Sequence, residues 1–168
     1  MTINDFVRKL ILEVEQILQD NYFQNIHGET VDIKGYPHEL PIRSVQAGWE
    51  QTAESGEELF PYFLVQLDEI HYEDGEALAT VWILFAVYDE STDMTGWKNL
   101  TNAVEKVVHR FRCNVALDYY YCERKMKVAY PEDGSWPHFF AGMEMTWHLP
   151  VLMPENLEGG EWNEQESI

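Results

Sequence analysis

The stretch FPYFLVQLDEIHYEDGEALATVWILFAVYDE, residues 60–90, decides the fold of this chain. Two runs rich in β-branched and aromatic residues flank the short turn EDG, a pattern typical of a β-hairpin. Apolar residues occupy both faces of the second run: Val81, Ile83, Phe85 and Val87 alternate with Trp82, Leu84, Ala86 and Tyr88. We therefore expect a central strand that is covered on both faces, by helices or by a neighbouring subunit.

Two amphipathic helices are predicted on either side of this hairpin. From Asn4 to Tyr22 apolar residues recur at helical spacing, and they form one stripe: Phe6, Val7, Leu10, Ile11, Val14, Ile17 and Leu18. The second helix follows STDMTGWKN and runs to about Arg112. Its expected buried stripe is Trp97, Leu100, Val104, Val107, Val108 and Phe111.

A second antiparallel pair is predicted after the second helix. It comprises VALDYYYCERKMKVAY, the turn PEDG and the closing stretch DGSWPHFFAGMEMTWHLP, residues 133–150. The order helix, arm, hairpin, helix, hairpin predicts an α+β fold. We expect an antiparallel sheet of about four main strands, with two helices packed mainly on one face, in a single domain of residues 1–150.

Two segments do not fit this regular pattern. Residues 23–58 mix glycine, proline and charge, so we expect a long irregular arm with short strands near 31–33 and 42–49. Such long segments are usually functional, often in assembly or binding. Residues 151–168 carry five acidic residues and no Lys or Arg, and we expect a flexible tail.

The 168 residues carry a formal net charge of −19, from 30 acidic and 11 basic side chains. A surface of this charge repels phosphate backbones, which argues against nucleic-acid binding. Either simple solubility or an acidic channel that does not retain passing DNA accounts for the charge. No apolar run reaches the roughly 18 residues of a membrane span, and no signal peptide is recognisable, so we expect a soluble cytoplasmic protein.

No catalytic motif stands out in the sequence. Among the six histidines, none lies in HExxH, and the best local cluster is DEIHYEDGE around His71, residues 68–76. A solvated hairpin end explains this cluster better than a divalent-ion site, and His38 beside Glu39 is explained better by a rigid loop. Cys113 and Cys122 match neither a redox pair nor a zinc pattern, and we expect two reduced thiols. These features predict a protein that is not an enzyme and needs no cofactor or metal.

The aromatic residues offer a different kind of site. We expect Trp82 and Phe85 to belong to the core of the central strand. Five others are candidates for a subunit or partner interface, because aromatic side chains are enriched in interface cores: Trp49, Trp136, Phe139, Phe140 and Trp147.

The layout resembles the tail-terminator, or tail-completion, proteins of long-tailed phages. The resemblance lies in FPYFLVQLDEI, VWILFAVYDE, the helix GWKNLTNAVEKVVHRF and WPHFFAGMEMTWHLP, and it covers roughly residues 59–150 with the leading helix. The version encoded in prophages of Gram-positive bacteria is the most similar.

The resemblance implies a non-enzymatic virion protein that forms a ring, typically a hexamer. Such a ring caps the tail tube, offers a joining surface to the head-completion protein, and lets DNA pass without binding it specifically. It would assemble in the host cytoplasm and would involve no membrane. The alternatives are another head–tail connector or neck component, a small binding module, or a metal-binding enzyme domain that uses the carboxylates around His71.

Overall fold

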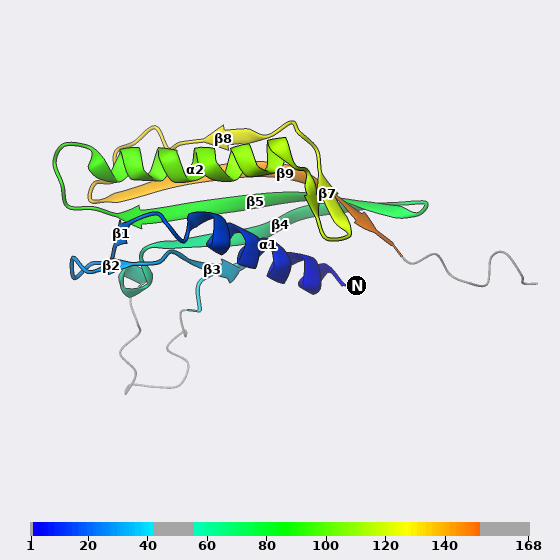
Figure 1. The fold of residues 1–168 in the computed structure, drawn as a ribbon, viewed down its shortest axis with the longest axis horizontal. Helices are drawn as coiled ribbons and strands as arrows, with labels where there is room; N and C mark the ends of the chain where they lie inside the picture. Colours follow the sequence, from blue (N-terminus) through cyan, green and yellow to red (C-terminus); the bar gives the residue numbers. More distant parts are fainter. Residues whose placement is uncertain (1, 42–55, 152–168) are drawn as a thin grey trace, which may run out of the picture.

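Two α-helices and nine strands are present in residues 2–41 and 56–151, the part of the chain that the computed structural model describes (Figure 1). In chain order they are α1 (Ile3–Leu18), β1 (Phe23–Gln24), β2 (Thr30–Val31), β3 (Lys34–Pro37), β4 (Tyr62–Glu73), β5 (Glu76–Tyr88), α2 (Thr95–Cys113), β6 (Ala116–Leu117), β7 (Tyr120–Cys122), β8 (Lys127–Ala129) and β9 (His138–Pro150). A short 3-10 helix, Gly56–Leu59, precedes β4. The expected α+β class is confirmed.

Strand β5 is the centre of the sheet. It pairs antiparallel with β4 from Tyr62↔Ala86 to Glu73↔Glu76, and this confirms the predicted hairpin. On its other side it pairs antiparallel with β9 along its whole length, from Glu76↔Pro150 to Tyr88↔His138. A β-bulge between Leu67 and Glu69 of β4 shifts the register, so that side chains beyond it exchange faces.

The prediction of about four main strands undercounts the sheet. Besides the long strands β4, β5 and β9, six short strands join it. The run expected to form one partner for β9 is divided into β6, β7 and β8. The chain turns sharply between β6 and β7 at Asp118, whose φ is 56°. Strands β7 and β8 both pair with β9, and β6 extends from β7.

The expected irregular arm is partly an ordered edge of the same sheet. Strand β3 pairs parallel with β4, from Lys34↔Tyr62 to Pro37↔Val65. Strand β1 pairs with β2 and contacts the end of β5 through Gln24↔Tyr88. The strand expected near residues 31–33 is therefore present as β2, whereas the one expected near 42–49 lies outside the described residues.

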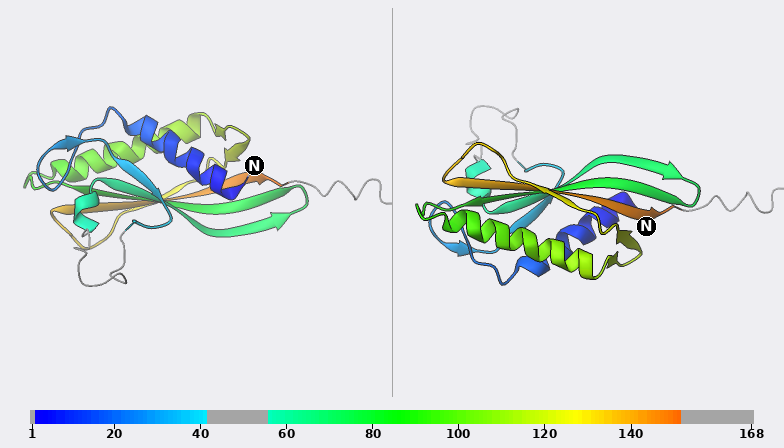
Figure 2. Two further views of the ribbon diagram at one scale, coloured as in Figure 1. Left: turned by 90° about the horizontal axis from the view of Figure 1, so that it is seen from below. Right: turned by 90° about the horizontal axis from the view of Figure 1, so that it is seen from above.

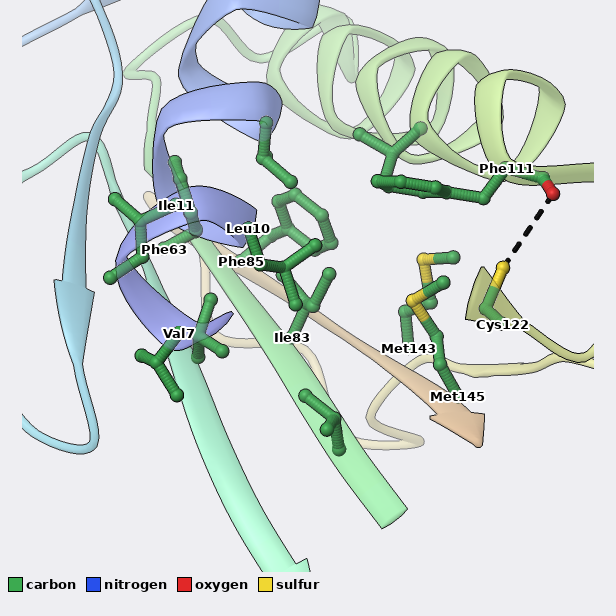
Figure 3. Packing of buried hydrophobic residues seen from close by; sticks show 14 of the residues in the cluster. Val7, Leu10, Ile11, Phe63, Ile83, Phe85, Phe111, Cys122, Met143 and Met145 are labelled. Atoms are coloured by element: carbon green, nitrogen blue, oxygen red, sulfur yellow. Dashed lines mark hydrogen bonds between the residues drawn. The ribbon is translucent and has the colours of Figure 1, made fainter. Parts of the chain in front are cut away.

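Both helices pack on one face of the sheet, as predicted (Figure 2). The side chains on this face of β5 are fully buried, and with the two helix stripes and alternate residues of β9 they form one core (Figure 3). Thr2 is the N-cap residue of α1, because its hydroxyl accepts a hydrogen bond from Asp5 N at 3.1 Å. The predicted stripe of α2 differs at Trp97, which is 47% exposed.

Polar contacts join the helices to each other and to the following loop. Arg110 Nε donates to Glu13 Oε1 at 2.8 Å, and Arg110 Nη2 donates to the carbonyl of Ala116 at 3.1 Å. Arg110 thus connects α2 with α1 and with the start of β6. Within the described part of the chain, neither helix is both long and apolar enough to cross a membrane.

The two cysteines lie in contrasting environments. Cys122 is buried, its thiol donates to the carbonyl of Phe111 at 3.6 Å, and burial raises the pKa of this thiol to about 11 (Figure 3). Cys113 is exposed at the end of α2, with its Sγ 3.6 Å from the His109 ring.

Gly35 of β3 provides the first test of this packing. A Cβ at this position would lie 2.6 Å from Phe63 Cε2 and 2.8 Å from Ile11 Cγ2. Because Phe63 is fully buried, its ring has no free space to move into. Gly35→Ala is expected to lower the free energy of unfolding by about 1–3 kcal/mol. Gly134→Ala, which meets nothing within 4 Å, is the control and should change it by less than about 0.5 kcal/mol in urea unfolding.

The thiols provide a second test. At pH 8 we expect one fast-reacting thiol per native chain, because Cys113 is exposed whereas burial keeps Cys122 protonated and inaccessible. Titration with a chromogenic disulfide before and after unfolding measures this directly. Two fast thiols in the native protein would contradict the placement of Cys122, and Cys113→Ser should remove the fast reaction.

Candidate subunit interface

The helices leave the second face of the sheet uncovered in the described part of the chain. Side chains that alternate with the core residues point toward this face. Ala86 among them is buried, but the larger ones are only half-buried: Tyr62, Leu64, Trp82, Leu84 and Tyr88. Trp82 was expected in the core with Phe85. Phe85 is buried on the helix-covered face, but Trp82 lies on the opposite face, so that prediction was wrong for Trp82.

A groove of about 400 Å³ runs across this open face. Leu64 and Leu84, with Phe140, line it, and the segment after β8 contributes Tyr130 and Pro131. Gly142 of β9 lies opposite Leu84, and the missing side chain leaves room there. A Cβ on Gly142 would come within 3.3 Å of Leu84 Cδ2.

Aromatic rings gather at the end of the face where β9 begins. The Phe60 ring lies 4.9 Å from the rings of Tyr62 and His138, and 6.1 Å from that of Phe140, measured between centroids. The Tyr88 ring also packs against His138, with 5.3 Å between the ring centroids. These tilted, edge-on arrangements stabilise aromatic clusters and hold the rings in fixed positions.

A second exposed group of rings adjoins the groove. Trp136 is 51% exposed and held by a hydrogen bond from its Nε1 to the carbonyl of Ser91 at 3.2 Å. The exposed Trp97 ring lies 6.2 Å from that of Tyr130. A smaller hollow of about 190 Å³ lies among these residues, and Tyr130, Pro131 and Phe140 line both hollows. We call this continuous surface the aromatic face: Tyr62, Leu64, Leu84, Trp97, Tyr130, Trp136 and Phe140.

The residues of the aromatic face are themselves uncharged, and the nearest carboxylates are those of Glu132 and Asp133, which line the smaller hollow. Burial raises the pKa of the phenol groups of Tyr62 and Tyr130 above their ordinary value, so both phenols are neutral at physiological pH. A surface of large, neutral, positioned rings is suited to contact with another protein, since such residues contribute most of the binding energy in interfaces.

The five candidate interface residues are divided by the structure. Trp136 and Phe140 lie together on the aromatic face, where Phe140 is 37% exposed. Phe139 points to the opposite side of β9, where its ring fills the space beside Gly96 at the start of α2. Trp49 lies outside the described residues. An interface role for the two exposed residues stays a prediction.

Trp147 belongs to the core. Its side chain has no exposed surface, and its ring packs 5.1 Å from Phe6 of α1 and 5.3 Å from Phe111 of α2. Its Nε1 finds no hydrogen-bond partner among the described residues. The assignment of Trp147 to an interface was therefore wrong, because both helices converge on this position of β9.

The candidate ion-binding residues do not converge. His71 lies 3.4 Å from Glu69, and both side chains are more than 60% exposed. His38 is positioned by its backbone, which has a φ of 67° and donates from N to the carbonyl of Val65 at 2.9 Å. Within residues 2–41 and 56–151, no group of three or more His, Cys, Asp or Glu side chains is arranged to hold a metal ion.

No protein-family model matches the chain, and a search of curated proteins finds no match either.

The alternation of β9 carried a signal that separates its aromatic residues. Phe139, Ala141, Met143, Met145, Trp147 and Leu149 share one face. The other face contains Phe140 with Gly142, Glu144, Thr146 and His148, and these polar residues mark it as the less buried one. Tyr62, Leu64 and Tyr130 carried no comparable signal, because only the folded chain brings them to one groove.

The two tryptophans give a matched test of this division. Trp147→Ala should lower the free energy of unfolding by about 3–5 kcal/mol, because it leaves a cavity between both helices and the sheet. Trp136→Ala should lower the free energy of unfolding by about 1 kcal/mol or less, since it removes a half-exposed ring and one hydrogen bond. Urea unfolding followed by circular dichroism measures both. Equal losses would contradict the placement of these residues.

Proposed function

We propose that this chain is a structural tail-completion protein of a long-tailed phage or prophage. In this role it forms a ring, six copies in the family that it resembles, at the head-proximal end of the tail. The ring caps the tail-tube protein and offers its other side to a head-completion protein. The protein acts by binding, with no catalytic step and no cofactor, and is made in the host cytoplasm before it enters the virion.

The observation that carries the proposal is the aromatic face. An apolar sheet face with a groove of about 400 Å³ exposes rings to water in an isolated chain. Large exposed apolar patches mark sites of protein association. In a ring, each subunit would bury this face against its neighbour or against the tube. The central strand then has both of its apolar faces covered, as its composition requires.

The charge supports the same role. Thirty acidic and eleven basic side chains give the chain a formal net charge of −19. A lumen lined by carboxylates offers no cation to the phosphates of a passing duplex, so DNA transits without being retained. Another connector of the neck region is the closest alternative, because a ring with an apolar contact face and an acidic lumen serves there equally well.

The oligomeric state of the purified protein tests the proposal. Mass photometry, alone and with tail-tube protein, should detect a closed oligomer or its assembly on tube ends. Monomers under both conditions would overturn the proposed function. Binding to a portal-side adaptor, but not to tube protein, would assign the chain to another position in the neck.

Variants of the aromatic face locate the contact. Trp136→Ser combined with Phe140→Ser should abolish assembly or weaken it at least about tenfold, since exposed aromatic residues dominate interface energies. Tyr22→Ser is the matched control, because Tyr22 is 80% exposed and lies outside the aromatic face. Normal assembly of the double variant, with unchanged circular dichroism, would show that this face is not the interface.

A further inference from the structure

A basic groove interrupts the acidic surface of the chain. It lies between α2 and β8 and has a volume of about 910 Å³. Lys106, His109 and Arg112 of the helix line it together with Arg124, and so does the carboxylate of Glu105. Spacings of three residues place the helical side chains on one face of α2. All four side chains are exposed.

The charge of this region is opposite to that of the rest of the chain. Residues 98–127 contain seven of the eleven Lys and Arg residues, but only three of the thirty acidic residues. Within the described ranges, Arg112 and Arg124 form no ion pair, and Lys106 is bound only to the neutral amide oxygen of Asn21 at 2.8 Å. Three cationic groups thus outnumber the carboxylate of Glu105 in the lining, and the groove keeps a net positive charge that suits an anionic partner.

A matching acidic element projects from the same chain. The tip of the β4–β5 hairpin, residues 68–76, carries five carboxylates and no Lys or Arg. The hairpin extends beyond both helices at one end of the molecule (Figure 2). Tyr72 at the tip is 65% exposed, and Glu69, Glu73 and Asp74 are exposed as well. Glu76 is instead engaged by His148 at 3.1 Å.

We propose that the hairpin tip of one copy binds in the basic groove of the next copy. This inference rests on the proposed self-assembly and names the contact that orders the copies head to tail. A contact between two different patches of one chain generates rings or filaments, whereas a contact of one patch with itself ends at a dimer.

The chemistry of the two elements is complementary. The carboxylates of Glu73 and Asp74 pair with the guanidinium groups of Arg112 and Arg124, which bind carboxylates through two parallel hydrogen bonds. Tyr72 packs its ring on the apolar lining that Val108 and Val128 supply. A two-stranded tip is narrow, since paired strands lie about 4.8 Å apart, and it enters a groove between a helix and a strand.

Nucleic acid fits the groove less well. A duplex extends far beyond a groove of this size, and its phosphates would meet the surrounding acidic surface. The hairpin tip is negatively charged like a duplex, but its carboxylates lie on a short element that does not extend over the surrounding acidic surface. The contact is electrostatic and partly exposed, so raising the salt concentration weakens it.

The exposed thiol of Cys113 lines the groove and supplies a direct test. Glu73→Cys in the full chain, oxidised with copper phenanthroline, should give disulfide-linked oligomers that disappear when Cys113→Ser is added. A disulfide requires the two Cβ atoms to approach to about 4 Å. Cross-linking is therefore much more efficient between docked copies than between copies that collide at random. Glu29→Cys, another exposed acidic position outside the tip, is the matched control and should give no disulfide-linked oligomers on a non-reducing gel. Equal cross-linking of both variants would overturn the proposal.

A charge exchange tests the pairing without a covalent bond. Arg112→Glu with Arg124→Glu should raise the apparent Kd for self-association at least about tenfold. Adding Glu73→Lys and Asp74→Lys to the same chain should restore association. A quadruple variant that stays dissociated while the Glu73→Lys, Asp74→Lys chain associates normally would contradict the proposed pairing.

The outcomes separate this inference from the proposed function. Rings that survive the arginine variants but not the aromatic-face variants would overturn the groove contact and leave the proposed function standing. Monomers in every condition, with and without tube protein, would overturn both. Fluorescence anisotropy with a 20-base-pair duplex tests whether the groove binds nucleic acid instead. Duplex binding that is lost in the arginine variant, with unchanged oligomeric state, would assign the groove to nucleic acid and overturn the hairpin contact.

Discussion

Strand β5 is paired on both sides, with β9 along its whole length and with β4 from Glu76 to Ala86. This double pairing is the constraint on which the other features depend. It fixes which side chains of three long strands share a face, because a shift of one residue would exchange the faces of a whole strand. The helices cover one of these faces and bury it completely at Val81, Ile83 and Phe85. The other face carries Trp82 and Leu84 of β5, which the described residues leave only half-buried.

The chain exposes two surfaces with different physical character. The aromatic face is neutral and apolar, so contacts there would gain mainly from the removal of rings from water. The basic groove and the acidic hairpin tip would contribute orientation and speed of encounter, and their attraction depends on salt. Together, an apolar contact for affinity and a charged contact for direction would give an acidic chain a defined way to assemble with itself.

Part of the candidate site was accessible from the sequence. Trp136 and Phe140 follow a turn signal and lie on the surface, next to each other. Trp147 was misplaced because aromatic density was weighed without the period of two that separates the faces of β9. Tyr62, Leu64 and Tyr130 were not predicted, because the groove that unites them forms only when β4, β9 and the segment after β8 come together.

The sequence by itself determined the local elements. The apolar periods of α1 and α2, the β-branched runs around the Asp74–Gly75 turn, and the strong acidity follow from residues that are neighbours in the chain. Only the tertiary structure decided which face of the sheet stays open, that residues 23–41 supply edge strands, and that Arg124 comes beside Lys106 and Arg112. The physical reason is the separation in sequence between the residues that interact. Helix and strand periods arise from adjacent residues, whereas the covering of a face and the convergence of charges depend on which distant segments pack together.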